Sequence, residues 1–449
     1  MIRSFQRLRK LTPAQAIVSY YFLAIAISFI LLRLPGVHQE GVQLSFIDTL
    51  FTAVSAVSVT GLTVINVSET YTIWGIIMLM FILQLGGIGI MSIGTFFWLI
   101  LGKKIGLRER QLIMVDHNQL NMAGVVKLIR EIIKILLLIE LVGAVVLSIY
   151  FTQYFDTFQE SLIQGVFASV SATTNGGFDI TGQSMAPFFN DYFVQIINML
   201  LITLGAIGFP VLIELKEFLA NKNKNFRFSL FTKITTAMYG ILLVVGTLGI
   251  WLIEAFNSFR DLSWHESFFA AAFHSVSSRS GGLTTFDITQ FHEATEVFIS
   301  ALMFIGASPS SAGGGIRTTT FALALLFLIN FARGKNNIQI FGREIQLIDV
   351  FRSYAVIILA LFMVLASTMA LIITEPHASA VQIVFEITSA FGTAGMSLGI
   401  TDSLSTTGKF IIMGLMFVGR VGLISFLFTI GGKSDPTKFH YPKERVIIG

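Results

Sequence analysis

The chain has 449 residues, of which 54% are hydrophobic and only 12% charged, and its mean hydropathy is +0.77. Soluble globular proteins carry about 25% charged residues, and apolar runs of about 20 residues recur here, so we predict a polytopic membrane protein. This composition excludes a cytosolic enzyme, a nucleic-acid binder and a disordered scaffold. The absence of cysteine excludes disulfides, thiolate metal sites and cysteine nucleophiles.

The N-terminus carries the first of five basic clusters. Its sequence RSFQRLRK precedes an apolar run from Ala14 to Leu34. The run is too long for the core of a signal peptide and no cleavage site follows it, so we expect a retained membrane span. The positive-inside rule predicts that both termini and all five clusters face the cytoplasm, which delimits four excursions across the membrane. The clusters are Arg3, Arg7, Arg9 and Lys10; Lys103, Lys104, Arg108 and Arg110; Lys216, Lys222, Lys224, Arg227 and Lys233; Arg333, Lys335 and Arg343; and Lys433, Lys438, Lys443 and Arg445.

Each excursion is predicted to hold two long apolar runs with a shorter apolar segment between them. The paired runs span residues 14–34 and 72–101, 126–151 and 191–215, 232–254 and 294–331, and 349–373 and 408–430. The short segments are Phe46–Ser58, Ser161–Thr174, Glu266–Ser278 and Ala380–Phe391. Helices of this length reach only about 20 Å and cannot cross about 30 Å of hydrocarbon. Each is therefore expected to enter and leave the membrane on its outer side.

The four short segments end in one shared pattern. Aligned on a glycine, they read SAVSVTGL, SATTNGGF, VSSRSGGL and SAFGTAGM, with anchor glycines at Gly61, Gly177, Gly282 and Gly395. Successive anchors lie 116, 105 and 113 residues apart, which indicates an internal fourfold repeat. A phenylalanine lies ten positions before three of the anchors, at Phe51, Phe167 and Phe385, and nine before the other, at Phe273. We predict an all-α polytopic membrane protein of four helix–pore-helix–helix repeats with pseudo-fourfold symmetry, bounded at residues 1–101, 102–215, 216–332 and 333–449.

The ends of the short helices predict a site for a cation. Each helix C-terminus carries about half a negative charge, and unwound backbone beyond it can turn carbonyl oxygens toward an ion. Glycine suits this position because it reaches positive φ without strain. Carbonyl oxygens without carboxylates favour a weakly hydrated monovalent cation such as potassium. The alternative is that the glycines are small-residue contacts inside ordinary membrane helices. The predicted filter residues are Thr60, Gly61, Asn175, Gly176, Gly177, Ser280, Gly281, Gly282, Thr393, Ala394 and Gly395.

The sixth long run, residues 294–331, is too long for one span. It is interrupted at residues 307–320 by ASPSSAGGGIRTTT, in which a proline and three consecutive glycines cannot continue a helix without cost. We predict a broken helix whose freed backbone groups face a water-filled cavity. A plain kink or a short extramembrane loop is the alternative. Arg317 either closes the inner end of this loop or contacts lipid headgroups, and the sequence leaves both open.

Arg420 lies near the middle of the last long run. A charge at the bilayer centre costs about 2.5–3.5 kcal/mol, so we expect its side chain to face the cavity beneath the filter and to bond loop carbonyls. The alternative is an ion pair with Glu140, an acid in the middle of the third run.

Several strings resemble the Ktr/Trk/HKT superfamily of potassium transporters, and the membrane subunit of bacterial Ktr systems in particular. They are LFTAVSAVSVTGLTV (Leu50–Val64), LQLGGIGIM (Leu83–Met91), LGKKIGLRER (Leu101–Arg110), FEITSAFGTAG (Phe385–Gly395) and FVGRVG (Phe417–Gly422). The resemblance implies one pore per chain, a potassium-selective filter because Gly61 is kept, and an intramembrane gating loop. It supports a gating role for Arg420 and implies the same role for the loop residues Ser310, Ser311, Ala312, Gly313, Gly314 and Gly315.

The same resemblance implies a homodimer in the bacterial cytoplasmic membrane and a cytosolic nucleotide-binding regulatory ring subunit of the RCK type. No cofactor or nucleic acid is expected to bind this chain. Potassium is the expected substrate, and sodium is a candidate activator. A cation-coupled secondary transporter is the alternative function, although equal repeats with even numbers of crossings favour a pore over the inverted repeats of such proteins. A membrane-embedded enzyme would need convergent titratable groups, and the sequence offers only Arg420 and Glu140.

Overall fold

The computed structural model describes residues 12–90, 92–95, 105–116, 124–220, 226–335, 337–423, 425–427, 442 and 444. The predicted basic residues before Thr12, at 103–104 and 222–224, and in the tail from Lys433 lie outside this range. The described chain is helical apart from a short hairpin of β1 (Gln339–Ile340) and β2 (Arg343–Glu344). This confirms the predicted all-α class.

The helices follow the predicted order of first helix, re-entrant helix and second helix four times. The first two repeats contain α2 (Pro13–Leu32), α3 (Phe46–Ser58), α4 (Val67–Thr70), α5 (Ile73–Ile88), α7 (Leu107–Asp116), α8 (Val125–Phe151), α9 (Phe158–Thr173), η1 (Ala186–Phe188), α10 (Tyr192–Ala206) and α11 (Phe209–Ala220). The other two contain α12 (Leu230–Glu254), α13 (Trp264–Ser277), η2 (Ile288–Gln290), α14 (Glu293–Phe304), α15 (Thr318–Ala332), α16 (Leu347–Thr374), α17 (Ala380–Gly392) and α18 (Thr406–Val421). The residues at which the repeats meet stay a prediction.

All four re-entrant helices, α3, α9, α13 and α17, begin at a hydroxyl side chain. Ser45, Thr157, Ser263 and Ser379 each accept a hydrogen bond from the backbone N–H three residues later. Such a cap satisfies one of the free N–H groups at a helix start and stabilises it by about 1 kcal/mol. The phenylalanines that precede the anchors, of which Phe51 is an example, are buried in all four helices. The repeat is therefore visible at the start, middle and end of each re-entrant helix.

The first helices and the second helices differ in length. Within the described residues, the four helices long and apolar enough to cross a membrane are α2, α8, α12 and α16, the first of each repeat. The second helices of repeats 1, 2 and 4 stop or bend at a glycine with positive φ, namely Gly89, Gly208 and Gly422, whereas α14 of repeat 3 ends at Phe304, before the loop. At Gly208 the axes of α10 and α11 differ by 105°. These breaks within the predicted apolar runs of repeats 1, 2 and 4 were not predicted, and they arise because a glycine at positive φ cannot continue a right-handed helix.

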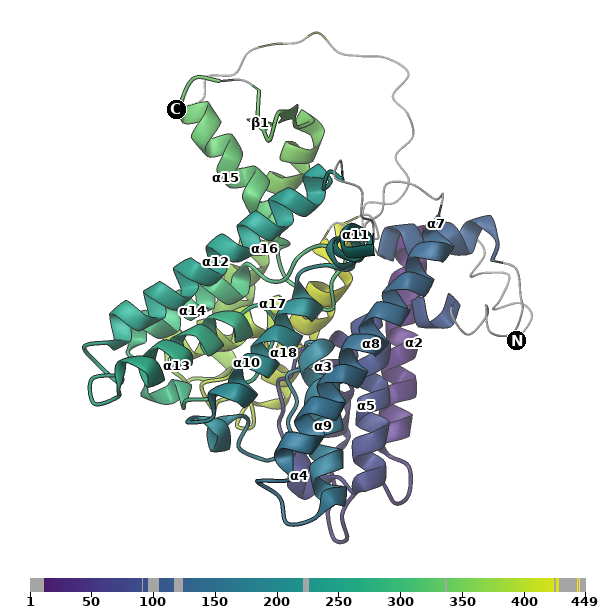
Figure 1. Ribbon diagram of the computed structural model, residues 1–449, viewed down its shortest axis with the longest axis vertical. Coiled ribbons are helices and arrows are strands. Elements are labelled where there is room, and N and C mark those ends of the chain that lie inside the picture. The colour runs from purple at the N-terminus through teal and green to yellow at the C-terminus, as the bar shows by residue number, and fades with distance from the viewer. Residues whose placement is uncertain are drawn as a thin grey trace.

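The repeats close into a ring. Each second helix packs against the re-entrant helix of the following repeat, as α5 on α9, α10 on α13, α14 on α17 and α18 on α3. Contact between α18 and α3 brings the last repeat against the first. Figure 1 shows α4 at one end of the bundle and α7, α11 and the β-hairpin at the other. The re-entrant helices thus lie between the second helices of neighbouring repeats and face a common centre.

Candidate functional site: a ring of re-entrant segments above a buried loop

The re-entrant helices end with closely similar backbone geometry. In repeats 1, 2 and 4, the residue before the anchor glycine donates its N–H to the carbonyl five residues earlier, as Thr60 does to Ser55 at 2.9 Å. In repeat 3 the equivalent bond, from Gly281 to Ser277, spans one residue fewer. This matches the spacing of Phe273, which is one residue closer to its anchor than the other three phenylalanines are. The predicted filter residues therefore lie directly beyond the helix ends.

Two positions in each segment have positive φ. The anchors Gly61, Gly177, Gly282 and Gly395 have φ of 91°, 68°, 70° and 86°. Two residues before them, Val59, Asn175, Ser280 and Thr393 have φ of 56°, 56°, 83° and 49°. A non-glycine residue in this region is uncommon, and here one occurs at the same place in all four repeats. The glycines therefore do not lie inside ordinary membrane helices, as the alternative interpretation required.

The four anchor glycines meet at one point. A Cβ placed on Gly61 would lie 2.8 Å from the Cα of Gly177, and one on Gly177 would lie 3.1 Å from the Cα of Gly282. A Cβ on Gly282 would lie 3.4 Å from the Cα of Gly395, and one on Gly395 would lie 3.1 Å from the Cα of Gly61. These four contacts follow the order of the repeats and close a ring. Any side chain at an anchor would enter the space between them.

Peptide oxygens also lie at this ring. A Cβ on Gly61 would be 2.9 Å from the carbonyl oxygen of Gly176, and one on Gly282 would be 2.9 Å from that of Ala394. The carbonyl oxygen of Thr60 lies close to both Gly177 and Gly395. The residues directly before the anchors thus direct main-chain oxygens toward neighbouring repeats.

On the outer side of the ring is a vestibule. It is lined by the three anchors Gly61, Gly177 and Gly395, and by the segments that follow them, and it contains Asp179 and Asp402. One carboxylate oxygen of Asp179 accepts hydrogen bonds from the backbone N–H groups of Thr181 at 3.1 Å and Gly182 at 2.8 Å. The vestibule is therefore acidic. The carboxylate of Asp179 also holds the turn that follows it in place through these hydrogen bonds.

On the other side of the ring is the loop between α14 and α15, residues 305–317, close to the predicted limits. Residues 306–314 are all buried, so it is not an extramembrane loop. Its backbone bonds to two other repeats: Ala312 donates to Gly205 at 3.1 Å, and Gly315 donates to Gly419 at 3.3 Å. A Cβ on Gly313 would lie 2.6 Å from the Cβ of Ser280, a predicted filter residue. The predicted gate residues Ser310 to Gly315 are therefore brought directly next to the filter segments.

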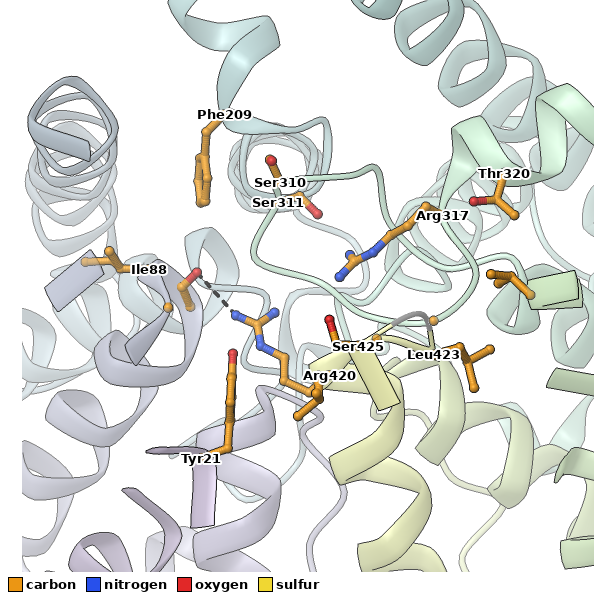
Figure 2. A pocket seen from close by; sticks show the side chains of 16 residues that line it. Tyr21, Ile88, Phe209, Ser310, Ser311, Arg317, Thr320, Arg420, Leu423 and Ser425 are labelled. Carbon is orange, nitrogen blue, oxygen red and sulfur yellow. Dashed lines mark hydrogen bonds between the residues drawn. The ribbon is translucent and has the colours of Figure 1, made fainter. Parts of the chain in front are cut away.

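Two arginines bond to neighbouring carbonyls of this loop. Arg420, which is 7% exposed, donates to the carbonyl oxygens of Ala312 and Gly86. Arg317 donates to the carbonyl oxygen of Gly313. Figure 2 shows the side chain of Arg420 extending from α18 and that of Arg317 from the end of the loop before α15, and both line a cavity together with Ser310 and other residues. The bond to Gly313 favours the predicted role of Arg317 at the end of the loop.

The predicted alternative of an ion pair between Arg420 and Glu140 is wrong. Glu140 accepts a hydrogen bond from the side-chain amide of Gln84 at 2.5 Å. Its backbone carbonyl accepts from the hydroxyl of Ser169, in the neighbouring α9, at 2.8 Å. The acid thus links α5, α8 and α9, while the charge of Arg420 is directed to peptide carbonyls.

Sequence reasoning missed three groups. The first is Val59, together with the left-handed conformation that it shares with the predicted filter residues Asn175, Ser280 and Thr393. That conformation could not be predicted, because Val59 and Thr393 are β-branched and disfavour it. Glu386, fully buried in α17, bonds the hydroxyls of Ser397 and Thr401 just after the fourth anchor, and it stands out only as an acid in an apolar helix. The third is Arg279, a fully buried charge three residues before Gly282, to which the sequence analysis gave no role.

Comparison with known proteins gives a consistent result. Residues 6–435 match the family model TrkH, described as a cation transport protein. The chain is similar to the Ktr system potassium uptake protein D of Bacillus subtilis (strain 168), with 54% identity over 98% of both chains. It is also similar to the Ktr system potassium uptake protein B of the same organism, with 36% identity over 98% of this chain and 97% of that one.

Two further matches bear on function and on fold. The potassium/sodium uptake protein NtpJ of Enterococcus hirae is 33% identical over 99% of both chains. Among solved structures, the crystal structure of the potassium transporter TrkH from Vibrio parahaemolyticus matches with a TM-score of 0.74. That match covers 93% of this chain and 85% of the other at 17% identity, so it shows a shared fold.

Proposed function

Because this chain belongs to the TrkH family of cation transport proteins, we propose that it takes up potassium across the bacterial cytoplasmic membrane through its ring of anchor glycines. The observation that carries this proposal is the meeting of Gly61, Gly177, Gly282 and Gly395, with an acidic vestibule on one side and a cavity on the other. Relatives named as potassium uptake proteins support the choice of ion.

In this proposal the filter ligands are main-chain carbonyl oxygens. Positive φ at the anchor and two residues before it, with ordinary φ between them, alternates the handedness of the backbone. This alternation directs successive carbonyl oxygens to one side of the chain instead of to opposite sides, as in a strand. Carbonyl oxygens directed to a common axis replace the hydration shell of a monovalent cation. The residues involved are Thr60, Gly61, Asn175, Gly176, Gly177, Ser280, Gly281, Gly282, Thr393, Ala394 and Gly395.

The buried loop is proposed to be the gate. It lies between the filter segments and the inner cavity, and an ion that leaves the filter for the cytoplasm meets Gly313 first. The guanidinium of Arg420 holds the loop through Ala312 and adds a positive charge that opposes cations. Opening then requires the loop to leave these carbonyl contacts. The proposed gate residues are Ser310, Ser311, Ala312, Gly313, Gly314, Gly315 and Arg420.

Substitution of Gly282 by serine tests the filter. The position has φ of 70°, and a Cβ there would lie 2.7 Å from the Cα of Gly177 and 2.9 Å from the carbonyl oxygen of Ala394. We expect rubidium uptake into proteoliposomes to fall about tenfold or more, equal to about 1.4 kcal/mol or more, and the preference for rubidium over sodium to decrease.

The matched control is Gly240→Ser, because a Cβ on Gly240 in α12 meets no atom within 4 Å. This variant should transport rubidium as the unmodified protein does. An unchanged preference for rubidium in folded Gly282→Ser would contradict a backbone filter at this position. Absence of rubidium uptake by the unmodified protein, reconstituted with its partners, would contradict the transport function itself.

Sodium is proposed as an activator or co-transported ion, because the similar protein of Enterococcus hirae is named for both potassium and sodium. Rubidium uptake measured with and without external sodium, at constant membrane potential, tests this second candidate. Stimulation by sodium alone indicates activation, whereas sodium entry in fixed proportion to rubidium indicates coupling. Equal rubidium uptake in both conditions would contradict either role.

We further propose that the chain forms a homodimer with both termini in the cytoplasm and is regulated by a separate cytosolic nucleotide-binding ring of the RCK type. The relatives named as components of a Ktr system support the idea of further subunits. Co-purification from membranes, followed by mass determination of the intact complex, tests both interactions. A monomer without any partner would contradict them.

A further inference from the structure

Arg279 is a fully buried charge to which neither the proposed filter nor the proposed gate assigns a task. It lies three residues before Gly282, and its side chain is 0% exposed. The other repeats have small or uncharged residues at this position, namely Ser58, Thr174 and Gly392. Repeat 3, which alone has a long loop within its second helix, thus also has the charge in its filter segment.

The guanidinium of Arg279 binds the end of α14. Its Nη1 donates to the carbonyl oxygen of Ile305 at 2.6 Å and to that of Leu302 at 3.3 Å. The last carbonyls of a helix lack partners within the helix and carry partial negative charge, so a cation there is favourable. In the described part of the chain, no carboxylate forms an ion pair with Arg279. The helix end therefore compensates this buried charge.

Ile305 is also the residue at which the chain leaves α14 and the loop begins. Arg279 thus attaches the start of the loop to the filter segment of repeat 3. The other end of the loop is attached to the filter segment of repeat 4, because Gly314 donates its N–H to the hydroxyl of Thr393 at 2.8 Å. The two filter segments are joined by a hydrogen bond from the Ser280 hydroxyl to the Thr393 carbonyl at 2.5 Å.

We propose that Arg279 is a positioning residue that couples the loop to the filter. The inference rests on the proposed function. Ile305 cannot move far without breaking the hydrogen bond from the buried side chain of Arg279 to its carbonyl oxygen. Arg279 directly precedes the filter residue Ser280 in the chain. A displacement of the loop therefore changes the filter segment, and a change of the filter is transmitted to the loop. Arg279 Nε and Nη2 have no hydrogen-bond partner in the described part of the chain, so donors remain for a second arrangement of the loop start.

A double-mutant cycle tests this coupling. The variants are Arg279→Gln, deletion of residues 310–315, and both together, reconstituted in proteoliposomes. Arg279→Gln alone is expected to raise rubidium uptake about tenfold in the absence of activating ligands, a coupling of about 1.4 kcal/mol, and to lower the preference for rubidium over sodium. In the deletion background, Arg279→Gln should leave the uptake rate unchanged, because the loop through which it acts is gone.

An equal fold-change of uptake in both backgrounds would overturn the proposal, since it would show that Arg279 acts on the filter alone. Arg260→Gln, at an exposed arginine before α13, is the matched control and should behave as the unmodified protein does. If Arg279→Gln does not fold, the same cycle is measured with Arg279→Lys, which keeps the charge but can bond the two carbonyls less well. Loss of uptake by the unmodified protein would instead contradict the proposed function.

Discussion

At the scale of single residues, the filter segments combine glycines with strained residues. Val59 and Thr393 have β-branched side chains and φ of 56° and 49°. A residue held in this region costs about 1–3 kcal/mol and persists only where the surroundings fix it. Here the hydrogen bonds of the helix end and the packing of four repeats supply that constraint. Strain in the same place in four repeats points to function, because packing alone would not require it four times.

Arg420 carries a prediction at this scale. Replacement by glutamine removes the charge and the bonds to the carbonyl oxygens of Ala312 and Gly86. We expect unstimulated rubidium uptake to rise about tenfold, since breaking one buried charged interaction costs about 1.5–3 kcal/mol. Tracer uptake into proteoliposomes measures the change. Arg352→Gln, an exposed arginine near the start of α16, is the control. Uptake by Arg420→Gln equal to that of the control would contradict the role of Arg420 in the gate.

At the scale of elements, glycines inside the second helices, three residues before the breaks in repeats 1, 2 and 4, allow close packing under the filter. Cβ atoms on Gly86, Gly205 and Gly419 would collide with the carbonyl oxygens of Val57, Thr173 and Phe391, four residues before the anchors. Each second helix thus approaches the end of a re-entrant helix at backbone distance. In repeat 3 the side chain of Arg279 bonds the carbonyl oxygens of Leu302 and Ile305, at the end of α14 where the loop begins.

The loop itself carries the second prediction. Deletion of residues 310–315 removes the backbone bonds from Ala312 to Gly205 and from Gly315 to Gly419, together with the atoms that fill the space beneath Ser280. We expect rubidium uptake to rise about tenfold or more without activating ligands. Size-exclusion chromatography verifies the fold. Unchanged or abolished uptake in folded protein would contradict an obstructing loop.

At the scale of the whole molecule, the ring is closed by contact between the last and first repeats. Lys409 in α18 donates to the carboxylate of Asp48 at 2.8 Å. Asp48 lies in the first turn of α3, outside the spanning helices. Partial burial opposes its ionisation, but the hydrogen bonds from Lys409 and Ser45 outweigh this and lower the pKa of Asp48 below its usual value. The pair therefore links two ends of the chain that are far apart in sequence.

This ion pair gives a pH-dependent prediction. Because the pKa of Asp48 is lowered on folding, its contribution to the free energy of unfolding is fully present above the unfolded pKa and is lost as pH falls through the folded pKa. Lys409→Met should lower the melting temperature by a few degrees at pH 7, as expected for about 1 kcal/mol. The difference from the unmodified protein should shrink below about pH 4.

Thermal unfolding in detergent at both pH values measures the effect. Arg352→Met serves as the control because it breaks an exposed pair with Asp349 within one helix. A melting temperature of Lys409→Met that is unchanged at pH 7, or lowered equally at both pH values, would contradict the assigned role of the pair.

The amino-acid sequence alone was sufficient for the membrane class, the four repeats and the position of the broken helix in repeat 3. These features depend on local properties: apolar runs of limited length, Ser and Thr caps such as Ser45, and glycines that end helices. They are repeated four times, which makes the pattern visible without any tertiary contact. The filter and gate residues were predicted for the same reason, and their assigned roles stay a proposal.

Only the tertiary structure decided how these segments meet. The ring of glycines, the partners of Arg420 and the attachment of the loop to Gly205, Gly419 and Thr393 join residues from different repeats. No local pattern encodes which carbonyl a buried guanidinium reaches, because that depends on the packing of helices more than 100 residues apart. For this reason the sequence left two kinds of partner open for Arg420, loop carbonyls and Glu140, and the folded chain directs that charge to the carbonyl oxygens of Ala312 and Gly86.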